Sequence, residues 1–274
     1  MKSFFYRFLI ELTNGKWSSY LIKKFAYSRI SSIIIPSFAK LYQINIKEME
    51  KNIKEYKNLH EFFIRKLKPG VRTSKADVEE VISPVDAIIE EMGIISGEHT
   101  ITVKDKRYSI SEMLGSEKSV QKYAGGTYII FYLSPSHYHR IHSPVEGEIV
   151  KQWTLGSKSY PVNKWGIKYG RDTLAKNYRT ITEVKTADNQ FAAIIKVGAM
   201  FINSIVLSHK GEKLKKGEEM AYFSFGSTVI LLFEEGTFIS KDFLSTPYPV
   251  KIGEVIGNLT RENMDKKINL GSNN

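Results

Sequence analysis

The stretch from Gly217 to Phe233 carries the clearest hydrophobic pattern in the chain. Its second half, Val229 to Phe233, is an unbroken apolar run rich in β-branched and aromatic residues, which predicts a buried strand. The first half also favours a strand. Between the halves lies Gly226-Ser227-Thr228, and a glycine inside a strand pattern indicates a bulge or a close backbone approach.

Short apolar segments with turn residues between them predict further strands from about residue 80 onward. These predicted strands are Val81–Ile82, Ala87–Met92, Thr100–Val103, Tyr128–Leu133, Glu148–Thr154, Thr180–Thr186, Phe191–Val197 and Ile202–Leu207. A short helix is predicted at Ile110–Leu114. Stretches beginning at Pro144, Leu214 and Val250 each resemble a hairpin of biotinyl-type barrel-sandwich domains. We therefore expect an α+β fold with a mainly antiparallel, barrel-sandwich-like β core.

The first seventy residues show helical rather than strand periodicity. Four amphipathic helices are predicted, at Phe4–Leu12, Trp17–Ile35, Ile46–Tyr56 and Leu59–Leu67. Pro36 follows the second of them, and Lys68-Pro69-Gly70 breaks the helical region. The chain is therefore expected to divide into a helical region, 1–70, and a β-rich domain, 71–274.

Positive charge is concentrated in the first quarter of the chain. Residues 1–75 contain 16 Lys and Arg against 5 Asp and Glu, an excess of 11 that equals the net charge of the whole protein. Basic helices with Phe, Trp and Leu on one side are typical of a membrane interface with anionic lipid. A helical cap with solvated charges is the plain alternative. Nucleic acid is not expected as a partner, because the apolar faces are too extensive for a surface that follows phosphates.

The hydrophobic pattern also limits how the chain could meet a membrane. It contains no apolar run of about 20 residues, so no membrane-spanning helix is predicted. The N-terminus is basic and aromatic, but Glu11 interrupts it and no small-residue cleavage site follows, so no secretory signal is expected.

Candidate chemistry centres on histidine, because the absence of cysteine excludes disulfides, thiolate metal sites and cysteine nucleophiles. His137, His139 and His142 follow the predicted strand Tyr128–Leu133, at a strand end or loop where active sites are commonly built. Histidine is the side chain best suited to move protons at neutral pH. A structural role and zinc are the alternatives, but no metal is expected because the spacing does not match the helical His-Glu-x-x-His arrangement.

An acidic partner for these histidines is available at Asp86, in a proline-shaped turn that enters an apolar strand. Such an acid is often only a turn former, but it could also hydrogen-bond an imidazole and fix its tautomer. Asp86, His142 and Ser227 would then be acid, base and nucleophile, with the Ser227 hydroxyl beside the carbonyl of Gly226. The plain alternative at Gly226 is a strand kink followed by satisfied hydroxyl groups.

Five motifs, taken together and in this order, resemble the phosphatidylserine decarboxylase family. The motifs are Phe62–Gly70, Ser83–Asp86, Tyr138–Pro144, Val197–Ala199 and Phe225–Thr228. The resemblance covers the chain from about residue 55 to its end. Three positions depart from the family pattern: Phe225 stands where Leu is usual, Ala87 where Gly is common, and His137 where an acidic residue is expected. None of them removes a reacting group.

The resemblance implies a self-processing enzyme, made as a zymogen, whose pyruvoyl cofactor (a covalent pyruvate) comes from Ser227. His142, oriented by Asp86, would take the Ser227 proton, and the peptide bond after Gly226 would become an ester. β-Elimination and hydrolysis would then leave a β chain of residues 1–226 and an α chain of residues 227–274 that begins with the pyruvoyl group. The hydroxyl of Thr228 would assist.

The resemblance also implies a lyase of phospholipid biosynthesis that converts phosphatidylserine to phosphatidylethanolamine through a Schiff base on the pyruvoyl ketone. His139 would protonate the carbanion, and Val197, Gly198 and Ala199 would form part of the substrate pocket. The expected partners are phosphatidylserine and an anionic membrane surface, and the two chains would form a heterodimer that could itself dimerise. The expected location is peripheral, at the cytoplasmic face of the cell membrane.

Two other classes of protein remain open at this point. A Ser-His-Asp hydrolase would use the same three residues on an external ester, but it would want its serine on an exposed elbow. A non-catalytic β domain that binds anionic membranes would explain the charge distribution but not the histidine cluster.

Overall fold

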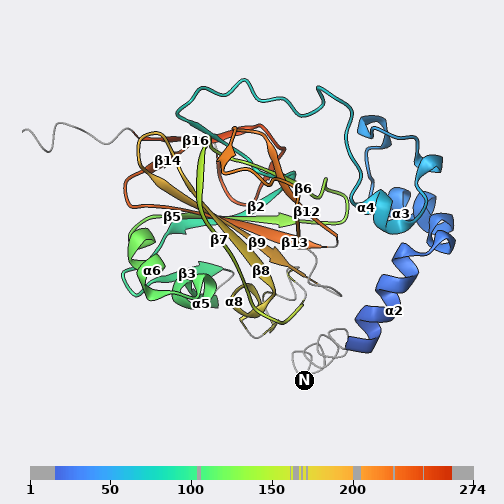
Figure 1. The fold of residues 1–274 in the computed structure, drawn as a ribbon, viewed down its shortest axis with the longest axis horizontal. Helices are drawn as coiled ribbons and strands as arrows, with labels where there is room; N and C mark the ends of the chain where they lie inside the picture. Colours follow the sequence, from blue (N-terminus) through green and yellow to red (C-terminus); the bar gives the residue numbers. More distant parts are fainter. Residues whose placement is uncertain are drawn as a thin grey trace, which may run out of the picture.

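The computed structural model describes residues 16–103, 106–160, 162, 167, 169–170, 172–199, 205–224, 226–242 and 244–260. The predicted helix Phe4–Leu12, the first three residues of the predicted strand Ile202–Leu207, and Phe225 lie outside these residues. Helices come first in the described chain, and most strands follow them. In Figure 1 the N-terminal helices lie along one side of the β core.

The N-terminal region consists of short helical elements. They are α2 (Lys16–Tyr27), η1 (Arg29–Ile34), α3 (Ile35–Leu41), η2 (Ile46–Glu48), η3 (Ile53–Glu55) and α4 (Leu59–Phe63), where η denotes a 3-10 helix. Ile35, Met49, Tyr56 and Phe62 form the centre of a small hydrophobic cluster among them. Among the helices described, none combines the length and apolarity needed to cross a bilayer.

Two predictions for this region were wrong in ways that local chemistry explains. Pro36 does not end a helix, but lies in the first turn of α3, where its missing N–H costs nothing because that group has no partner within a helix anyway. The predicted helix Ile46–Tyr56 is replaced by η2 and η3. Asn45 and Asn52 precede these turns, and each side chain accepts a hydrogen bond from the N–H two residues later, which competes with α-helical hydrogen bonding.

The other two predicted helices are present but shorter. The prediction Trp17–Ile35 was one helix, whereas the structure ends α2 at Tyr27 and continues as η1. The prediction Leu59–Leu67 extended too far, because α4 stops at Phe63 and the following residues lie along the β core.

The strands form four sheets, and every named strand pair in the described chain is antiparallel. The strands are β1 (Glu80–Ile82), β2 (Ala87–Ile94), β3 (Thr100–Val103), β4 (Lys106–Ser109), β5 (Thr127–Leu133), β6 (Arg140–His142), β7 (Gly147–Leu155), β8 (Arg179–Lys185), β9 (Phe191–Gly198), β10 (Ile205–Leu207), β11 (Lys213–Leu214), β12 (Glu219–Phe223), β13 (Ser227–Phe233), β14 (Phe238–Ser240), β15 (Tyr248–Val250) and β16 (Val255–Leu259).

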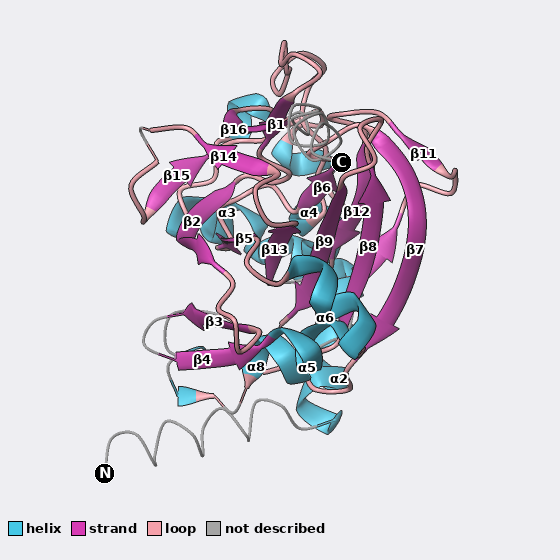
Figure 2. Ribbon diagram, turned by 90° about the vertical axis from the view of Figure 1, so that its left-hand side faces the viewer, coloured by secondary structure: helices cyan, strands magenta, loops and turns pink. Residues whose placement is uncertain are grey.

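The largest sheet has eight strands in the order β11-β7-β8-β9-β13-β5-β2-β15, and the smaller sheets are β10-β12-β6, β1-β16-β14 and β3-β4. The helices within this region are α5 (Ile110–Leu114), α6 (Glu117–Tyr123) and α8 (Thr173–Lys176). Figure 2 shows these helices gathered at one end of the large sheet. As far as the described residues reach, the predicted strands are confirmed within a few residues, and of Ile202–Leu207 the described part is β10. The fold is mixed α and β with mainly antiparallel sheets, and none of the described sheets closes into a barrel, so the barrel-sandwich detail is not confirmed.

Strand β13 lies inside the large sheet, and all seven of its residues are buried. Val229, Leu231 and Phe233 pack in one core cluster, while Ile230 and Leu232 pack in another on the opposite face of the sheet. This is the reason for the unbroken apolar run: a strand covered on both faces has no solvent side that polar residues could occupy.

Candidate active site

Ser227 begins β13 and is fully buried. It pairs with Gly198 of β9 on one side and Leu133 of β5 on the other. Its Oγ has no hydrogen-bond partner among the residues described, and neither has the Oγ1 of Thr228. Side chains alternate along a strand, so Ser227 lies on the face of Val229 and Thr228 on the opposite face.

The carbonyl group of Gly226 is held by the end of β9. The Ala199 N–H donates to the Gly226 oxygen at 3.0 Å, and the neighbouring Gly198 oxygen accepts from the Asn177 side-chain amide at 2.8 Å. Apart from its two chain neighbours, no heavy atom of the described residues lies within 4 Å of where a Cβ on Gly226 would stand. The predicted pocket residues Val197, Gly198 and Ala199 therefore flank the peptide bond predicted to break.

The sheet β10-β12-β6 covers the face on which Ser227 lies. Ile141 of β6 and Ala221 and Phe223 of β12 pack in the same core cluster as Val229. β6 carries His142 and follows His139, so the histidines belong to the layer that covers Ser227. Because side chains alternate along β6, Ile141 points to the Ser227 face and His142 to the opposite side of this layer. Along β12, His142 is paired with Glu219, while the His139 oxygen accepts from the Phe223 N–H at 2.9 Å. His139 thus lies at the end of β12 from which the chain continues to Ser227.

His142 is a neutral imidazole with a defined tautomer. Its Nδ1 lies 2.7 Å from the oxygen of Gly217, and because a carbonyl oxygen can only accept, Nδ1 carries the proton. Nε2 is therefore a bare lone pair, and it is buried without a partner in the described chain. Burial lowers the pKa of His142 below 6.5, and the hydrogen bond to Gly217 opposes this shift. A neutral imidazole with a free lone pair can act as a base at neutral pH.

His139 has the same tautomer in a more enclosed setting. It is fully buried, its Nδ1 donates to the His137 oxygen at 2.9 Å, and its Nε2 has no partner among the described residues. The ring lies 3.9 Å, centroid to centroid, from the ring of Phe63. Burial lowers the pKa of His139 well below 6.5, and the positive charge of Arg65 lowers it further.

His137 differs from the other two histidines because its Nδ1 accepts a hydrogen bond. The backbone N–H of Ser134 donates to it at 3.0 Å, so that the ring closes the turn after β5. A carboxylate at this position would accept the same N–H, which explains how histidine replaces the acidic residue expected here.

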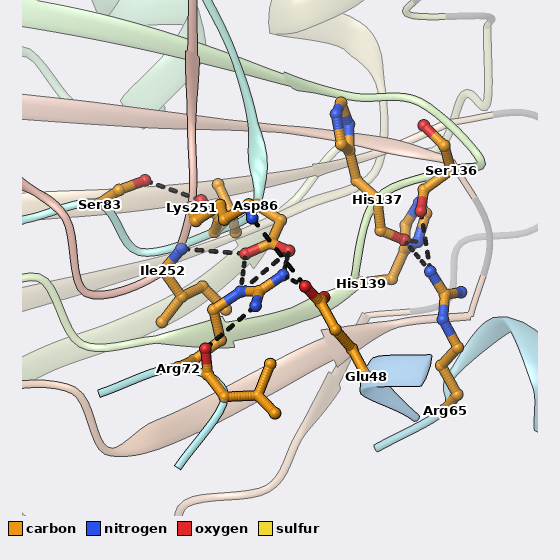
Figure 3. A network of polar contacts seen from close by, with 12 residues as sticks. Glu48, Arg65, Arg72, Ser83, Asp86, Ser136, His137, His139, Lys251 and Ile252 are labelled. Carbon is orange, nitrogen blue, oxygen red and sulfur yellow. Dashed lines mark hydrogen bonds and ion pairs between the residues drawn. The ribbon is translucent and has the colours of Figure 1, made fainter. Parts of the chain in front are cut away.

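Asp86 does not hydrogen-bond to His142 in this structure. Its carboxylate accepts from Arg72, with Nη2–Oδ2 at 2.5 Å and Nε–Oδ1 at 2.9 Å, and from the N–H of Ile252 at 3.0 Å. Arg72 also pairs with Glu48 at 2.9 Å. Figure 3 shows this network, with Asp86 facing Arg72. The turn that carries Asp86 is nevertheless adjacent to His142, because the His142 N–H donates to the Pro84 oxygen at 2.8 Å.

The structure thus brings Ser227, Gly226 and Val197–Ala199 into direct contact, and it links His142 to the turn that carries Asp86. It joins neither histidine to Ser227 by a hydrogen bond within the described chain. Sequence reasoning missed Gly217, the partner that fixes the His142 tautomer, and Arg72, the partner of Asp86. For Arg72 the only signal was its position in the segment after Pro69 that ends the helical region. Nothing in the sequence indicated that Gly217 would be the partner of His142.

A buried serine hydroxyl without a partner, beside a carbonyl held by an N–H group and beneath a layer with neutral imidazoles, is typical of an enzyme rather than a binding module. Comparison with known proteins agrees. The family model described as "Phosphatidylserine decarboxylase" matches residues 59–258. The chain therefore belongs to the phosphatidylserine decarboxylase family, whose members are carboxy-lyases.

Close relatives extend the match beyond the family model. A protein of Geobacillus kaustophilus is 58% identical over 257 residues, which cover 94% of this chain and 97% of that protein. A protein of Bacillus thuringiensis is 54% identical over 256 residues, covering 93% of this chain and 97% of the relative. Both are named "Phosphatidylserine decarboxylase proenzyme". The burial of Ser227 also disfavours the hydrolase alternative, which would want an exposed serine.

Proposed function

We propose that this chain is a proenzyme that cleaves itself between Gly226 and Ser227 and then converts phosphatidylserine to phosphatidylethanolamine and CO2. The observation that carries the proposal is the buried, unpartnered hydroxyl of Ser227 beside the Gly226 carbonyl, which accepts the Ala199 N–H. These residues fit a pyruvoyl group derived from Ser227 at the start of a new chain, 227–274. That group supplies the carbonyl that draws electrons from the bond to the departing carboxylate.

Self-cleavage needs a base, a nucleophile and a polarised carbonyl. The Ser227 hydroxyl loses its proton to an imidazole, and its oxygen attacks the carbonyl carbon of Gly226. The C–N bond breaks as the C–O bond forms, and the imidazole returns the proton to the nitrogen of residue 227, which leaves an ester between Gly226 and the side chain of residue 227. Loss of the Cα proton and cleavage of the Cβ–O bond of residue 227 then release the chain 1–226 as a carboxylate. Water replaces the nitrogen of residue 227, which leaves as ammonia. The Ala199 N–H, 3.0 Å from the Gly226 oxygen, stabilises the negative charge that develops on that oxygen.

His142 is the proposed base for this step. Its neutral form and the free lone pair on Nε2 support the role. In the structure the carbonyl group of Gly217, and not Asp86, fixes the tautomer of His142. Asp86 contributes at longer range, where its negative charge raises the pKa of His142 against the larger, lowering effect of burial.

His139 is the proposed proton carrier in decarboxylation. In the observed tautomer its Nε2 is an acceptor, so the residue must take up a proton before it can donate one. The ammonium group of phosphatidylserine has to lose a proton before its nitrogen can act as a nucleophile. This ammonium proton is the one that His139 takes up. His139 then returns it to the carbon atom from which CO2 has left. Val197, Gly198 and Ala199 form part of the proposed pocket wall.

The N-terminal region is the proposed membrane-binding surface. Leu21, Ile30, Ile33 and Leu41 are each more than 60% exposed, which is unusual for aliphatic side chains gathered in one short region. Lys23, Lys24, Arg29 and Lys40 occur among them in sequence. Exposed aliphatic side chains with interspersed cations suit the boundary between anionic headgroups and acyl chains.

In this proposal residues 1–70 form the membrane-binding region and residues 71–274 the catalytic domain. The mature protein is a heterodimer of its own β chain, 1–226, and α chain, 227–274. It acts as a peripheral protein at the cytoplasmic face of the cell membrane.

The proposal is tested by the intact mass of the purified protein together with CO2 release from carboxyl-labelled phosphatidylserine in detergent micelles. We expect two chains divided after Gly226, a smaller chain that resists N-terminal sequencing because a carbonyl replaces its amine, and labelled CO2. A single uncut chain that releases no CO2 would contradict both the cofactor and the reaction.

A further inference from the structure

The last residue of α4 and the two residues after it contact the histidine loop, residues 136–142, one after another. The Phe63 ring lies against His139, the Ile64 oxygen accepts from Arg140, and Arg65 reaches the turn before His139. Figure 3 shows Arg65 directed at the backbone of Ser136 and His137. The mechanism proposed above assigns no role to these residues, although they contact the loop that carries His139 directly.

Arg65 and His139 share one acceptor, the carbonyl oxygen of His137. Nη2 of Arg65 donates to it at 3.0 Å and also to the Ser136 oxygen at 2.8 Å, while Nδ1 of His139 donates to it at 2.9 Å. A carbonyl held by a guanidinium is fixed in direction and carries more negative charge at its oxygen. It therefore favours the His139 tautomer that has the proton on Nδ1 and the lone pair on Nε2.

The charge of Arg65 acts on His139 as well. Arg65 is 4% exposed, and no carboxylate lies within ion-pair distance of it in the described chain, whereas Arg72 pairs with both Glu48 and Asp86. Burial lowers the pKa of Arg65 to about 10, so it remains charged at neutral pH. A positive charge close to His139 and not directly paired opposes protonation of the imidazole.

The other groups around His139 do not reverse this effect. His137, on the same loop, lowers the pKa of His139 further, and only the hydrogen bond to the His137 oxygen raises it. The elements packed against the ring and backbone contribute Phe63 and Phe223, neither of which titrates.

We propose that Arg65 is a positioning residue for decarboxylation, which holds His139 as a neutral imidazole with its Nε2 lone pair directed to the reaction. The inference rests on the proposed role of His139 as proton carrier. Arg65 works through the His137 carbonyl and through its own charge, and it does not touch the substrate.

The first experiment measures decarboxylation of short-chain phosphatidylserine in micelles against pH. In Arg65→Gln the charge is lost and His139 protonates at higher pH, so the acid limb of the kcat profile moves up by about one pH unit and kcat falls about tenfold. KM stays unchanged. Arg65→Lys keeps the charge, so its acid limb remains near that of the wild type, although kcat falls because the bond to two carbonyls is lost.

Arg179→Gln is the matched control, because Arg179 is also buried and also donates to backbone carbonyls, in its case those of Met113, Glu112 and Asn177. Its loss should lower stability without moving the acid limb. An unshifted acid limb in Arg65→Gln would overturn the proposal. So would a raised KM with unchanged kcat, which would make Arg65 a contact for a substrate anion.

A second measurement needs no arginine variant to fold. In the Ser227→Ala precursor, nitrogen NMR of labelled histidine should show His139 with its proton on Nδ1 and no titration between pH 8 and pH 6. The Nε2–H tautomer, or a midpoint near 6.5, would overturn the proposal. This spectrum remains decisive even if the wild-type protein releases no CO2, an outcome that would count against the proposed function alone.

Discussion

Asp86 and Ser227 are the acid and the nucleophile of the predicted Asp-His-Ser relay, and they differ in how their polar atoms are hydrogen-bonded. The Asp86 carboxylate accepts hydrogen bonds from Arg72 and from the Ile252 N–H, so both of its oxygens are engaged. The Ser227 hydroxyl has no partner among the described residues, and the same holds for Nε2 of His139 and of His142. Both regions are buried, so burial by itself does not explain the difference.

The difference separates polar groups that stabilise the fold from polar groups without partners, to which the proposed function assigns the reaction. Buried polar atoms in folded proteins are nearly always hydrogen-bonded, and leaving one unpaired costs about 1–3 kcal/mol. At Asp86 the network includes Glu48, so it ties the helical region to a turn of the β core. At Ser227 the unpaired hydroxyl costs stability, and in the proposed mechanism it is the group that attacks the Gly226 carbonyl.

The largest expected effect comes from removing the unpartnered hydroxyl itself. Ser227→Ala should abolish self-cleavage and CO2 release completely, because no oxygen remains to attack Gly226. The matched control is Thr228→Ala, since Thr228 also has a buried, unpartnered hydroxyl but lies on the opposite face of β13. It should still cleave. Gel analysis of the two chains measures both, and a Ser227→Ala protein that cleaves would remove the basis of the comparison.

The next effect distinguishes the two free imidazoles. His142→Gln should slow self-cleavage by about 10²–10⁴-fold, as loss of a general base does, while His139→Gln should cleave and then fail to release CO2. The neutral form is the active base and its pKa is lowered, so wild-type cleavage should be flat above pH 6.5 and slow only below it. Pulse-chase of the precursor gives these rates. If His139→Gln blocked cleavage and His142→Gln blocked only CO2 release, His139 would be the base for cleavage and His142 the proton carrier. The position of His139 at the Ser227 end of β12 would then explain its role.

A smaller effect is expected at Asp86, where both carboxylate oxygens are hydrogen-bonded, and it concerns the free energy of unfolding. Arg72→Met would leave the buried Asp86 and the partly buried Glu48 without their cation, which should lower the free energy of unfolding by about 3–5 kcal/mol. Lys251→Met is the control: Lys251 is exposed and lies 3.9 Å from Glu48, so its loss should cost less than about 1 kcal/mol. Urea unfolding of the Ser227→Ala precursor compares them. Equal losses would mean that the Asp86 network does not tie the regions together.

The smallest expected effect is a gain in stability at Lys196. This lysine is fully buried on the same face of the large sheet as Ser227, and its Nζ donates to the Thr182 hydroxyl at 2.7 Å. Burial lowers its pKa from 10.5 to about 7, so the unfolded chain binds more protons than the folded one between these values, and stability rises with pH there. Lys196→Met should therefore stabilise the precursor by about 1–4 kcal/mol.

The pH dependence identifies the cause of that gain. The advantage of Lys196→Met should be largest at pH 7 and below, and it should shrink as the pH approaches 10.5, where the wild type no longer has to release a proton on folding. Lys213→Met, at an exposed position of β11, should change little. A gain that is the same at every pH would indicate better packing rather than removal of a buried charge.

The sequence predicted the β region well because strand patterns are local. The prediction Thr100–Val103 coincides with β3, and Ile110–Leu114 coincides with α5. It also located Ser227 beside the strand that proved to be fully buried on both faces. The helical region was predicted less well, since Asn45 and Asn52 form side-chain turns that compete with the helix and apolar spacing does not report this.

What the sequence determined by itself was the order of helices and strands, the concentration of positive charge in the first quarter, and the set of candidate reactive side chains. Only the tertiary structure decided the partners of those side chains. Arg72 is 14 residues from Asp86, and Gly217 is 75 residues from His142. The period of a strand is a property of neighbouring residues. A buried hydrogen bond instead depends on which distant part of the backbone is packed within about 3 Å of the side chain. For that reason the candidate reactive residues could be named from the sequence, and the carbonyl that holds His142 could not.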